Sequence, residues 1–398
     1  MGVDPGDLTK PAFCPMLHCD MTTPDETQGM TPAPPAPYGR IAVLGMGAWG
    51  TALAATAARA GASVTLWGRS ARQAARIAAT GRNERYLPRY DLPDGITPTA
   101  DPAEAVAGAE AILLVTPSGS VRQMAKMIAD HAPAAIPVFV CAKGIEEGTG
   151  LLMAEVAADA APGRTIGVIS GPTFATETVA EHPTAVTVAC DGKGEDGPSS
   201  TAAARMARTL TTDTFRPYVS NDIVGVEVGG AVKNVIAIAC GILAGAGFGE
   251  NTRAAIITRG LQEMKELAVR LGGTRETVTG LSGIGDLMLT CSSTQSRNFS
   301  YGLQRGKGIA EKDVFEGKPV VVEGRLNAKT VTDLARRLGL HMPICEMVRS
   351  VTADGRPIGE AFAAYWAAPI ESEPRDLALK FAHPAESQAA KRFGDLLP

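Results

Sequence analysis

Short apolar runs alternate with longer stretches of helix-forming residues between residues 40 and 210. The runs are rich in β-branched side chains and short enough to be buried strands. The expected strands are 40–44, 63–67, 111–115, 138–141, 166–169 and 184–189. The expected helices are 51–60, 102–107, 121–129, 151–160 and 202–210. This alternation predicts an α/β domain with a mostly parallel, doubly wound sheet and right-handed crossovers.

The pattern changes near residue 220, where strand-like runs largely stop and helical periodicity continues. The expected helices of this part are 222–244, 254–271, 307–313, 326–338 and 343–352. The change predicts a second, all-α domain that begins near residue 220.

Three glycines follow the first expected strand at the spacing GxGxxG, as Gly45, Gly47 and Gly50. In a strand–turn–helix unit, the first makes a tight turn, the second lets the backbone approach a pyrophosphate, and the third lets helix and strand pack closely. The helix N-terminus adds N–H groups and a positive dipole end. The motif predicts a Rossmann-type dinucleotide site, and the alternative is an ordinary βα turn.

Four parts follow from these patterns. Residues 1–37 form a Pro-rich extension that is expected to be disordered, or that precedes a working start at Met30. Residues 38–219 form the dinucleotide-binding domain, residues 220–387 the helical substrate and catalytic domain, and residues 388–398 a loose tail.

Composition narrows the classes of function. The net charge of −4 and the pI near 5.8 argue against a protein that binds nucleic acid. Seven scattered cysteines without a C-x-x-C pair predict free thiols in a reducing compartment, and we expect a cytoplasmic protein. With only five histidines, no metal site is expected. The best membrane candidate, residues 235–248, is too short to span, so no membrane span is expected.

The end of the second strand bears on cofactor choice. An acidic residue is expected there when the site prefers NAD(H), because it accepts hydrogen bonds from the ribose hydroxyls. This chain instead reads Trp67-Gly68-Arg69-Ser70. A cation suits a 2′-phosphate, so Arg69 favours NADP(H), and the alternative is a solvated charge in a turn.

Polar residues follow three other strands. These are Thr116–Ser118, Lys143 and Ser170–Ala175. In doubly wound sheets ligands bind beyond the carboxyl ends of the strands, so we expect these residues to lie over the same crevice as the glycine loop.

Lys233 lies in an apolar, glycine-rich helical stretch, residues 225–237, where hydrophobic side chains are expected. Partial burial lowers the pKa of an amine toward the range that is useful for proton transfer. Lys233 is therefore a candidate acid/base, and the alternative is a structural ion pair.

Two further clusters carry polar groups. Glycines around Asp286 can make a turn that aims its carboxylate inward, although an Asx turn or helix cap has the same composition. Ser296, Arg297 and Asn298 place a hydroxyl, a guanidinium and an amide together, which suits a phosphate monoester at a helix start. A surface arginine beside a cap is the alternative.

Together these stretches resemble the NAD(P)-dependent glycerol-3-phosphate dehydrogenases of the bacterial type, from about residue 38 to residue 355. The matching stretches are 45–54, 66–69, 142–146, 170–177, 225–234, 280–290, 294–299 and 321–324. The resemblance implies interconversion of dihydroxyacetone phosphate and sn-glycerol 3-phosphate with NADP(H) or NAD(H), and a role in supplying glycerol phosphate for phospholipid.

The resemblance also implies roles for residues. Lys233 would exchange the proton of the C2 oxygen. The substrate would be held by Lys143, Gly171, Thr173, Lys233, Asp286, Ser296, Arg297 and Asn298, with Arg297 and Asn298 at the phosphate. The cofactor would be lined by Gly45, Gly47, Ala48, Trp49, Gly50, Arg69, Lys143, Ala175, Arg297, Val321 and Glu323.

Two other interpretations stay open on the sequence. One is a 3-hydroxyacid or 6-phosphogluconate-type dehydrogenase, which also combines a Rossmann domain, a helical domain and a lysine. The other is a nucleotide sensor, which would bind NADPH without needing Lys143 and Lys233 together. The expected partners are a small-molecule substrate and a second copy in a homodimer.

Overall fold

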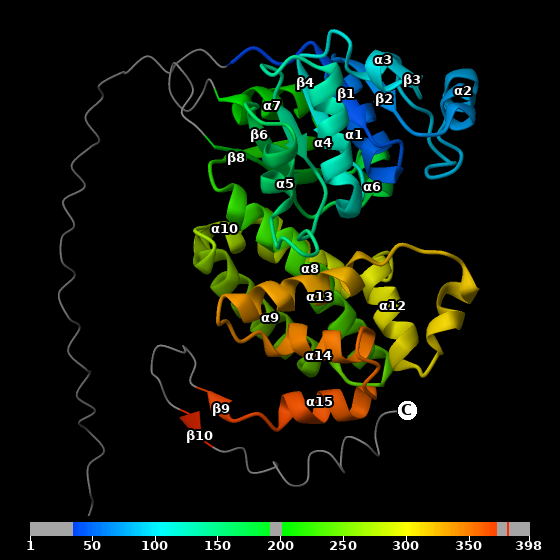
Figure 1. Cartoon of the computed structure of the whole chain (residues 1–398). Helices are drawn as coiled ribbons and strands as arrows, with labels where there is room; N and C mark the ends of the chain where they lie inside the picture. Colours follow the sequence, from blue (N-terminus) through cyan, green and yellow to red (C-terminus); the bar gives the residue numbers. More distant parts are fainter. Residues whose placement is uncertain (1–34, 192–200, 372–379, 382–398) are drawn as a thin grey trace, which may run out of the picture. The chain divides into compact units, whose positions relative to one another are not determined.

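Strands from the first half of the chain form one eight-stranded sheet in the order β3-β2-β1-β4-β5-β6-β7-β8 (Figure 1). The structure, a computed structural model, describes residues 35–191, 201–371 and 380–381. The strands are β1 Arg40–Leu44, β2 Ser63–Trp67, β3 Ile96–Thr99, β4 Ala111–Leu114, β5 Val138–Val140, β6 Ile166–Ser170, β7 Thr184–Cys190 and β8 Phe215–Ser220. All neighbouring pairs are parallel except β6 and β7. The predicted mostly parallel sheet is confirmed.

Helices cover both faces of this sheet. They are α1 Ala48–Arg59, α2 Ala71–Thr80, α3 Pro102–Val106, α4 Val121–His131, α5 Met153–Ala160, α6 Ala175–Val179 and α7 Ala202–Leu210. Alternate residues of β1 point to opposite faces: Ile41 and Val43 pack in one cluster with α1, α2 and α7, and Ala42 and Leu44 in another with α3, α4 and α5. Burial on both faces explains why these strands are continuous apolar runs.

The edge strands β3 and β8 were not predicted. Each contains a proline, Pro98 in β3 and Pro217 in β8, which weakens the strand signal. Proline is tolerated at an edge because it has no N–H to donate to another strand, and it discourages pairing with other chains.

The second half is helical, as predicted. Its helices are α8 Ile223–Gly245, α9 Glu250–Arg270, α10 Arg275–Val278, α11 Asp286–Ser292, α12 Arg297–Gly306, α13 Glu323–Arg337, α14 Pro343–Thr352 and α15 Ile358–Trp366. Helix α8 is buried along almost its whole length. It packs against α12 through facing glycines, because a Cβ on Gly241 would lie 2.1 Å from the Phe299 carbonyl oxygen and one on Gly302 2.2 Å from that of Ile238. The short strands β9 Ile370–Glu371 and β10 Lys380–Phe381 follow α15.

Helix α8 is also long and apolar enough to cross a membrane by length and composition, and it is longer than the stretch 235–248 considered from the sequence. However, 89% of its most apolar window is buried inside the protein, as expected for the core helix of this helical half.

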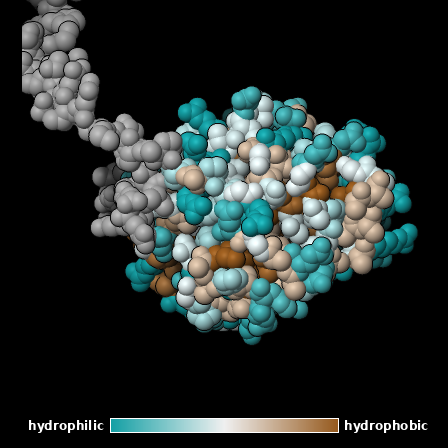
Figure 2. Space-filling view, turned by 90° about the horizontal axis from the view of Figure 1, so that it is seen from above, coloured by the Kyte–Doolittle hydropathy of each residue, from teal (hydrophilic) through white to brown (hydrophobic). Residues whose placement is uncertain are grey.

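On the face in Figure 2, hydrophobic residues form small patches among hydrophilic ones. Small apolar patches of this kind are normal on protein surfaces.

The helix predicted at 307–313 is wrong. The structure has a helix before this segment, α12, which ends at Gly306, and then a 3₁₀ segment at Glu311–Gly317. Phe315 and Glu316 in that segment adopt positive φ angles of 56° and 59°, which no regular right-handed helix allows. Most of the Pro-rich extension and the whole of the tail 388–398 lie outside the described residues.

Candidate functional site

The glycine loop joins β1 to the N-terminus of α1, as the motif predicts. Gly45 has a φ of 138°, and a Cβ there would lie 2.2 Å from the Val115 carbonyl oxygen. A Cβ on Gly50 would lie 1.8 Å from the Gly45 carbonyl oxygen. Gly47, by contrast, has nothing within 4 Å of a Cβ position, so its side of the loop is open to a ligand. The loop therefore has the shape that a pyrophosphate needs.

The polar residues expected at strand ends lie beyond β4, β5 and β6. The hydroxyls of Thr116, after β4, and Ser170, at the end of β6, are buried and have no hydrogen-bond partner within the described residues. Buried hydroxyls normally have a hydrogen-bond partner, so these two unpartnered hydroxyls at the carboxyl ends of strands are candidate ligand-binding groups. The donor groups present thus fit a dinucleotide.

Arg69 follows β2 and is exposed, with no hydrogen bond or ion pair to any described residue. The preceding Gly68 packs on Met46, because a Cβ would lie 2.6 Å from the Met46 Cβ. Val321 is exposed, and Glu323 begins α13. Within the part of the chain that the structure describes, the Arg69 guanidinium is thus unpaired and available to an anion.

A buried cluster of two lysines and one aspartate joins the two halves of the chain. Lys233 Nζ, from α8, donates to Asp286 Oδ1 at 2.5 Å, and Lys143 Nζ, after β5, donates to Asp286 Oδ2 at 2.5 Å. Lys233 also donates to the Thr290 hydroxyl at 2.8 Å. Asp286 is 1% exposed and Lys233 7%, whereas the Lys143 side chain is 19% exposed. Lys143 is therefore the most accessible of the three groups, and Asp286 the most deeply buried.

Close backbone packing brings these groups together. A Cβ on Gly229 would lie 2.5 Å from the Ser282 carbonyl oxygen, so glycine lets α8 touch the turn before Asp286. A Cβ on Gly230 would lie 3.1 Å from Lys143 Cγ, so this second glycine leaves room for that side chain. The turn itself, Leu281–Gly285, is a π-helical segment, a form that is common at functional sites.

Burial and charge shift the pKa values of this cluster. Burial lowers the pKa of Lys233 to about 8, and the Lys143 charge acts in the same direction while Asp286 opposes it. For Asp286, burial alone would raise the pKa, but the charges and hydrogen bonds of Lys143 and Lys233 lower it below its usual value. Asp286 is therefore an anion that holds two cations, and Lys233 is an amine close to its titration near neutral pH.

The Ser296–Asn298 cluster lies at the start of α12. Ser296 is the N-cap, since its hydroxyl accepts from the Phe299 N–H, and Arg297 is exposed without a partner among the described residues. Asn298 is buried, where its Nδ2 donates to Asn234 Oδ1 at 2.8 Å and its Oδ1 accepts from the Gly324 N–H at 2.9 Å. Arg297 is therefore the charged group of the three and is free to reach an anion, whereas the side chains of Ser296 and Asn298 already make hydrogen bonds within the protein.

Two other expected substrate residues lie after β6. Gly171 is tightly packed, because a Cβ would lie 2.9 Å from Val186 Cα, and Thr173 is partly buried. Beyond them, Gln295 Nε2 donates to Glu177 Oε1 at 3.1 Å. This bond ties α6, which begins at Ala175, to the segment before Arg297.

Two residues that hydrogen-bond to the candidate site residues were given no role in the sequence analysis. Thr290 lies one turn after Asp286 in α11 and bonds both Lys233 and the Asp286 carbonyl oxygen. Asn234 links Asn298 to Glu323, with its Nδ2 3.4 Å from Glu323 Oε2. Thr290 could have been found from the sequence by its i, i+4 spacing from Asp286, which places the two side chains on one face of a helix.

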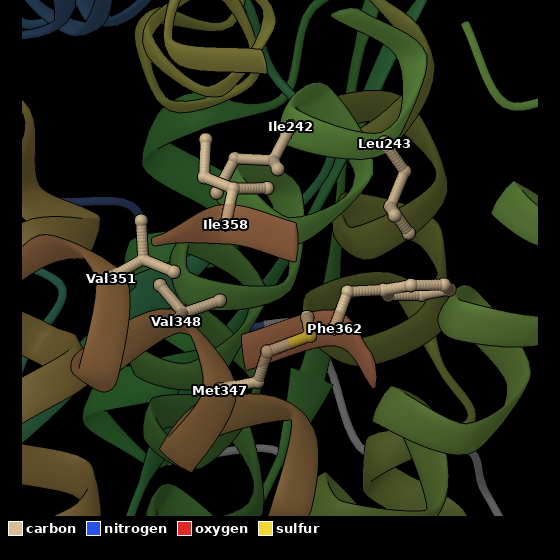
Figure 3. Close-up of a pocket in the computed structure, with 7 residues that line it drawn as sticks. All are labelled: Ile242, Leu243, Met347, Val348, Val351, Ile358 and Phe362. Atoms are coloured by element: carbon tan, nitrogen blue, oxygen red, sulfur yellow. The ribbon is translucent and has the colours of Figure 1, made fainter. Parts of the chain in front are cut away.

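Two openings in the structure lie away from this cluster. One is an apolar gap between α8, α14 and α15, whose lining side chains converge in Figure 3. Its lining residues are Ile242, Leu243, Met347, Val348, Val351, Ile358 and Phe362. The other is a polar cleft of about 320 Å³ between residues 146–150 and α13. Neither is lined by Lys143 or Lys233, and no group of side chains suited to a metal ion occurs in the described residues.

The fold and this cluster define a class. The sheet is doubly wound and carries a glycine loop at its β1–α1 turn. The helical half brings a buried lysine to the ends of the strands. This combination is the architecture of an NAD(P)-linked dehydrogenase.

Comparison with known proteins identifies the family. The model for the N-terminus of NAD-dependent glycerol-3-phosphate dehydrogenase matches residues 40–195, and the model for its C-terminus matches residues 222–363. The glycerol-3-phosphate dehydrogenase (NAD(P)+) of Rhodospirillum rubrum is 46% identical over 333 residues, 84% of this chain and 93% of that protein. The enzyme of that name from Caulobacter vibrioides is 45% identical over 336 residues, 84% of this chain and 99% of that protein.

The solved structures agree. The crystal structure of glycerol-3-phosphate dehydrogenase from Coxiella burnetii superposes with a TM-score of 0.77 at 37% identity, over 82% of this chain and 98% of that one. The chain belongs to the NAD(P)-dependent glycerol-3-phosphate dehydrogenase family. A D-mandelate dehydrogenase structure shares the fold at a TM-score of 0.54 and 15% identity, over 79% of this chain and 97% of that one, so the fold alone does not select the substrate.

Proposed function

We propose that this chain interconverts dihydroxyacetone phosphate and sn-glycerol 3-phosphate with NADP(H) or NAD(H). The observation that carries the proposal is the buried Lys233–Asp286–Lys143 cluster at the strand ends, in a chain whose relatives are named for this activity. The family assignment favours this substrate over those of the 3-hydroxyacid and 6-phosphogluconate-type enzymes.

In the proposed mechanism, Lys233 is the acid/base. When bound, the reduced nicotinamide supplies a hydride to the carbonyl carbon. As negative charge develops on the C2 oxygen, the Lys233 ammonium stabilises it and donates a proton to it. Lys143, which bonds the same carboxylate as Lys233, would add positive charge beside this oxygen, while Asp286 keeps both amines in place. In the oxidation of glycerol phosphate, the neutral Lys233 amine accepts the hydroxyl proton.

The remaining side chains are proposed to bind. Arg297, which is exposed and unpaired within the described residues, would hold the phosphate as a guanidinium fork. Gly171, Thr173, Ser296 and Asn298 would shape the substrate site around it. The cofactor site would comprise Gly45, Gly47, Ala48, Trp49, Gly50, Arg69, Lys143, Ala175, Arg297, Val321 and Glu323.

The direct test is the fall in NADPH absorbance when dihydroxyacetone phosphate is added to the full-length protein, with NADH run in parallel. Rapid oxidation that needs the substrate supports the proposal. A folded protein that binds NADPH without oxidising it would contradict the proposed reaction. The sibling dehydrogenases and the nucleotide sensor would then be the hypotheses to pursue.

The two directions of the reaction should respond oppositely to pH. Reduction needs the Lys233 ammonium, so its kcat is expected to fall as the pH rises through about 8; oxidation needs the neutral amine, so its kcat is expected to rise over the same range. The measurement is kcat at saturating substrates from about pH 6 to about pH 10 in each direction. A kcat without an inflection near pH 8 in either direction would contradict the lowered pKa of Lys233.

Arg69 should discriminate between the cofactors. In Arg69→Ala, the KM for NADPH is expected to rise about tenfold, because a charge-assisted contact to the 2′-phosphate is lost, while the KM for NADH stays within about twofold. Arg72→Ala, a nearby exposed arginine, is the matched control. Equal changes for both cofactors in Arg69→Ala would show that Arg69 does not select the 2′-phosphate.

We also propose a cytoplasmic homodimer that supplies glycerol phosphate for phospholipid. The cytoplasmic location is supported by the five cysteines among the described residues, which are all free and buried thiols. Cys14 and Cys19 lie outside the described residues. Light scattering coupled to size exclusion tests the dimer, and a monomer at micromolar concentration would contradict it.

A further inference from the structure

The Met46 carbonyl, within the glycine loop, is held by two amide side chains from outside the loop. Gln73 Nε2, from α2, donates to the Met46 oxygen at 3.1 Å, and Asn83 Nδ2, from the segment after α2, donates to it at 3.2 Å.

Asn83 joins the two sides of the loop. Its Nδ2 also donates to the Thr51 hydroxyl at 2.7 Å, and its Oδ1 accepts from Gln73 Nε2 at 3.1 Å. The residue is 0% exposed, and Thr51 is equally buried in the first turn of α1. One carboxamide therefore bonds the residue before Gly47 and the residue after Gly50, with all of its polar atoms satisfied.

The Asn83 backbone is fixed as well. Its carbonyl oxygen accepts from the N–H groups of Tyr86 and Leu87 at 3.1 and 2.8 Å, which closes a turn. Leu87 is buried in a small cluster with Ala52 and Ala55 of α1. The turn is therefore packed onto the helix whose N-terminus it helps to position.

This arrangement matters because of what a pyrophosphate requires. The first N–H groups of α1 have no carbonyl within the helix to bond, so they can bind an anion. A carbonyl oxygen turned toward the same anion would repel it. With two donors on its oxygen, the Met46 carbonyl is kept directed at the two amides, which fixes its orientation before any ligand binds.

We propose that Asn83 is a positioning residue for the dinucleotide loop: with Gln73, it keeps the Met46 carbonyl turned away from the cofactor phosphates and so lowers the Kd of either cofactor. The inference rests on the dinucleotide site proposed above and adds to it a residue that does not touch the cofactor.

Asn83→Asp is the sharpest variant, because it replaces the donor facing Met46 by a carboxylate oxygen of the same size. The Kd of NADPH and the Kd of NADH, measured by fluorescence titration of the full-length protein, are both expected to rise by about tenfold. The two factors should agree, since the cofactors share the pyrophosphate. At saturating NADPH, kcat and the KM for dihydroxyacetone phosphate should stay within about twofold of the wild-type values.

Thr209→Val is the matched control, since Thr209 is a buried hydroxyl of the same half that accepts from the Tyr38 N–H, far along the chain from the loop. It should lower the Tm without changing either Kd. Gln73→Ala, at a partly exposed position, gives a second measurement if Asn83→Asp does not fold, and should raise both Kd values about threefold.

The outcomes separate the two proposals. A wild-type protein that binds neither cofactor contradicts the dinucleotide site itself. Wild-type binding together with an unchanged Kd in both Asn83→Asp and Gln73→Ala overturns only the positioning role. A rise for NADPH alone would also overturn it, because that result would assign the effect to the 2′-phosphate.

Discussion

Replacing Lys233 by methionine is expected to reduce kcat for dihydroxyacetone phosphate reduction by about three orders of magnitude. The substitution removes the proposed proton donor and the charge that stabilises the developing oxyanion, and general acid catalysis alone contributes about 10²–10⁴-fold. Methionine preserves much of the buried volume, and Asp286 retains Lys143 as its counterion. The loss should therefore appear in kcat, while the Kd of NADPH stays within about twofold.

Lys329→Met is the matched control. Lys329 lies on α13 and pairs with Glu147 at the surface, outside the proposed site. It should keep wild-type kcat, and its small effect on stability is that of an exposed ion pair. If Lys233→Met retained more than about a tenth of the wild-type kcat, the result would contradict the proposed acid/base role of Lys233. If the variant failed to bind NADPH, a structural role for Lys233 would explain its activity loss.

Replacing Asp286 by asparagine is expected to have the second largest effect, on both stability and activity. The carboxylate is 1% exposed and is the anion that both Lys143 and Lys233 bond. Without it, two amines are left close together in a buried site, and removing one partner of such an arrangement costs about 3–5 kcal/mol. The pKa of Lys233 should fall further below 8, since the Asp286 charge opposes the lowering.

Two measurements separate these effects. Chemical denaturation at pH 7 should show the loss of stability, and the inflection in kcat for reduction should move to lower pH than in the wild type. The double variant Asp286→Asn with Lys143→Met removes one of the two competing charges and should recover part of the stability without recovering activity. Unchanged denaturation in Asp286→Asn would contradict the buried charge cluster.

Much of the fold could be predicted from local patterns. The central strands β1, β4 and β5 are buried on both faces, so they are short, mostly apolar runs. The glycine loop was predictable because the backbone itself requires glycine: Gly45 has a positive φ, and Gly50 has no space for a Cβ. Lys233 was recognisable because a charged residue interrupts an otherwise apolar helix.

The errors have physical reasons as well. The edge strands β3 and β8 carry proline and are only partly buried, so they lack the pattern of interior strands. The segment 307–313 has helix-forming residues, but the helical turns lie before it, where Ser296 caps α12 and glycines allow close packing on α8. Helix propensity is a weak term that such packing overrides.

The sequence by itself determined the class of fold, the dinucleotide loop and the candidate lysines, because these depend on periodicity, on backbone conformation and on charge within an apolar run. Only the tertiary structure decided which of the candidates act together. Lys143 and Lys233 are separated from Asp286 by 143 and 53 residues in the sequence. Their contacts with Asp286 depend on where the strand crossovers end. They depend also on how closely α8 approaches the turn before Asp286. Such distances are set by packing between elements, for which a single sequence carries no local signal.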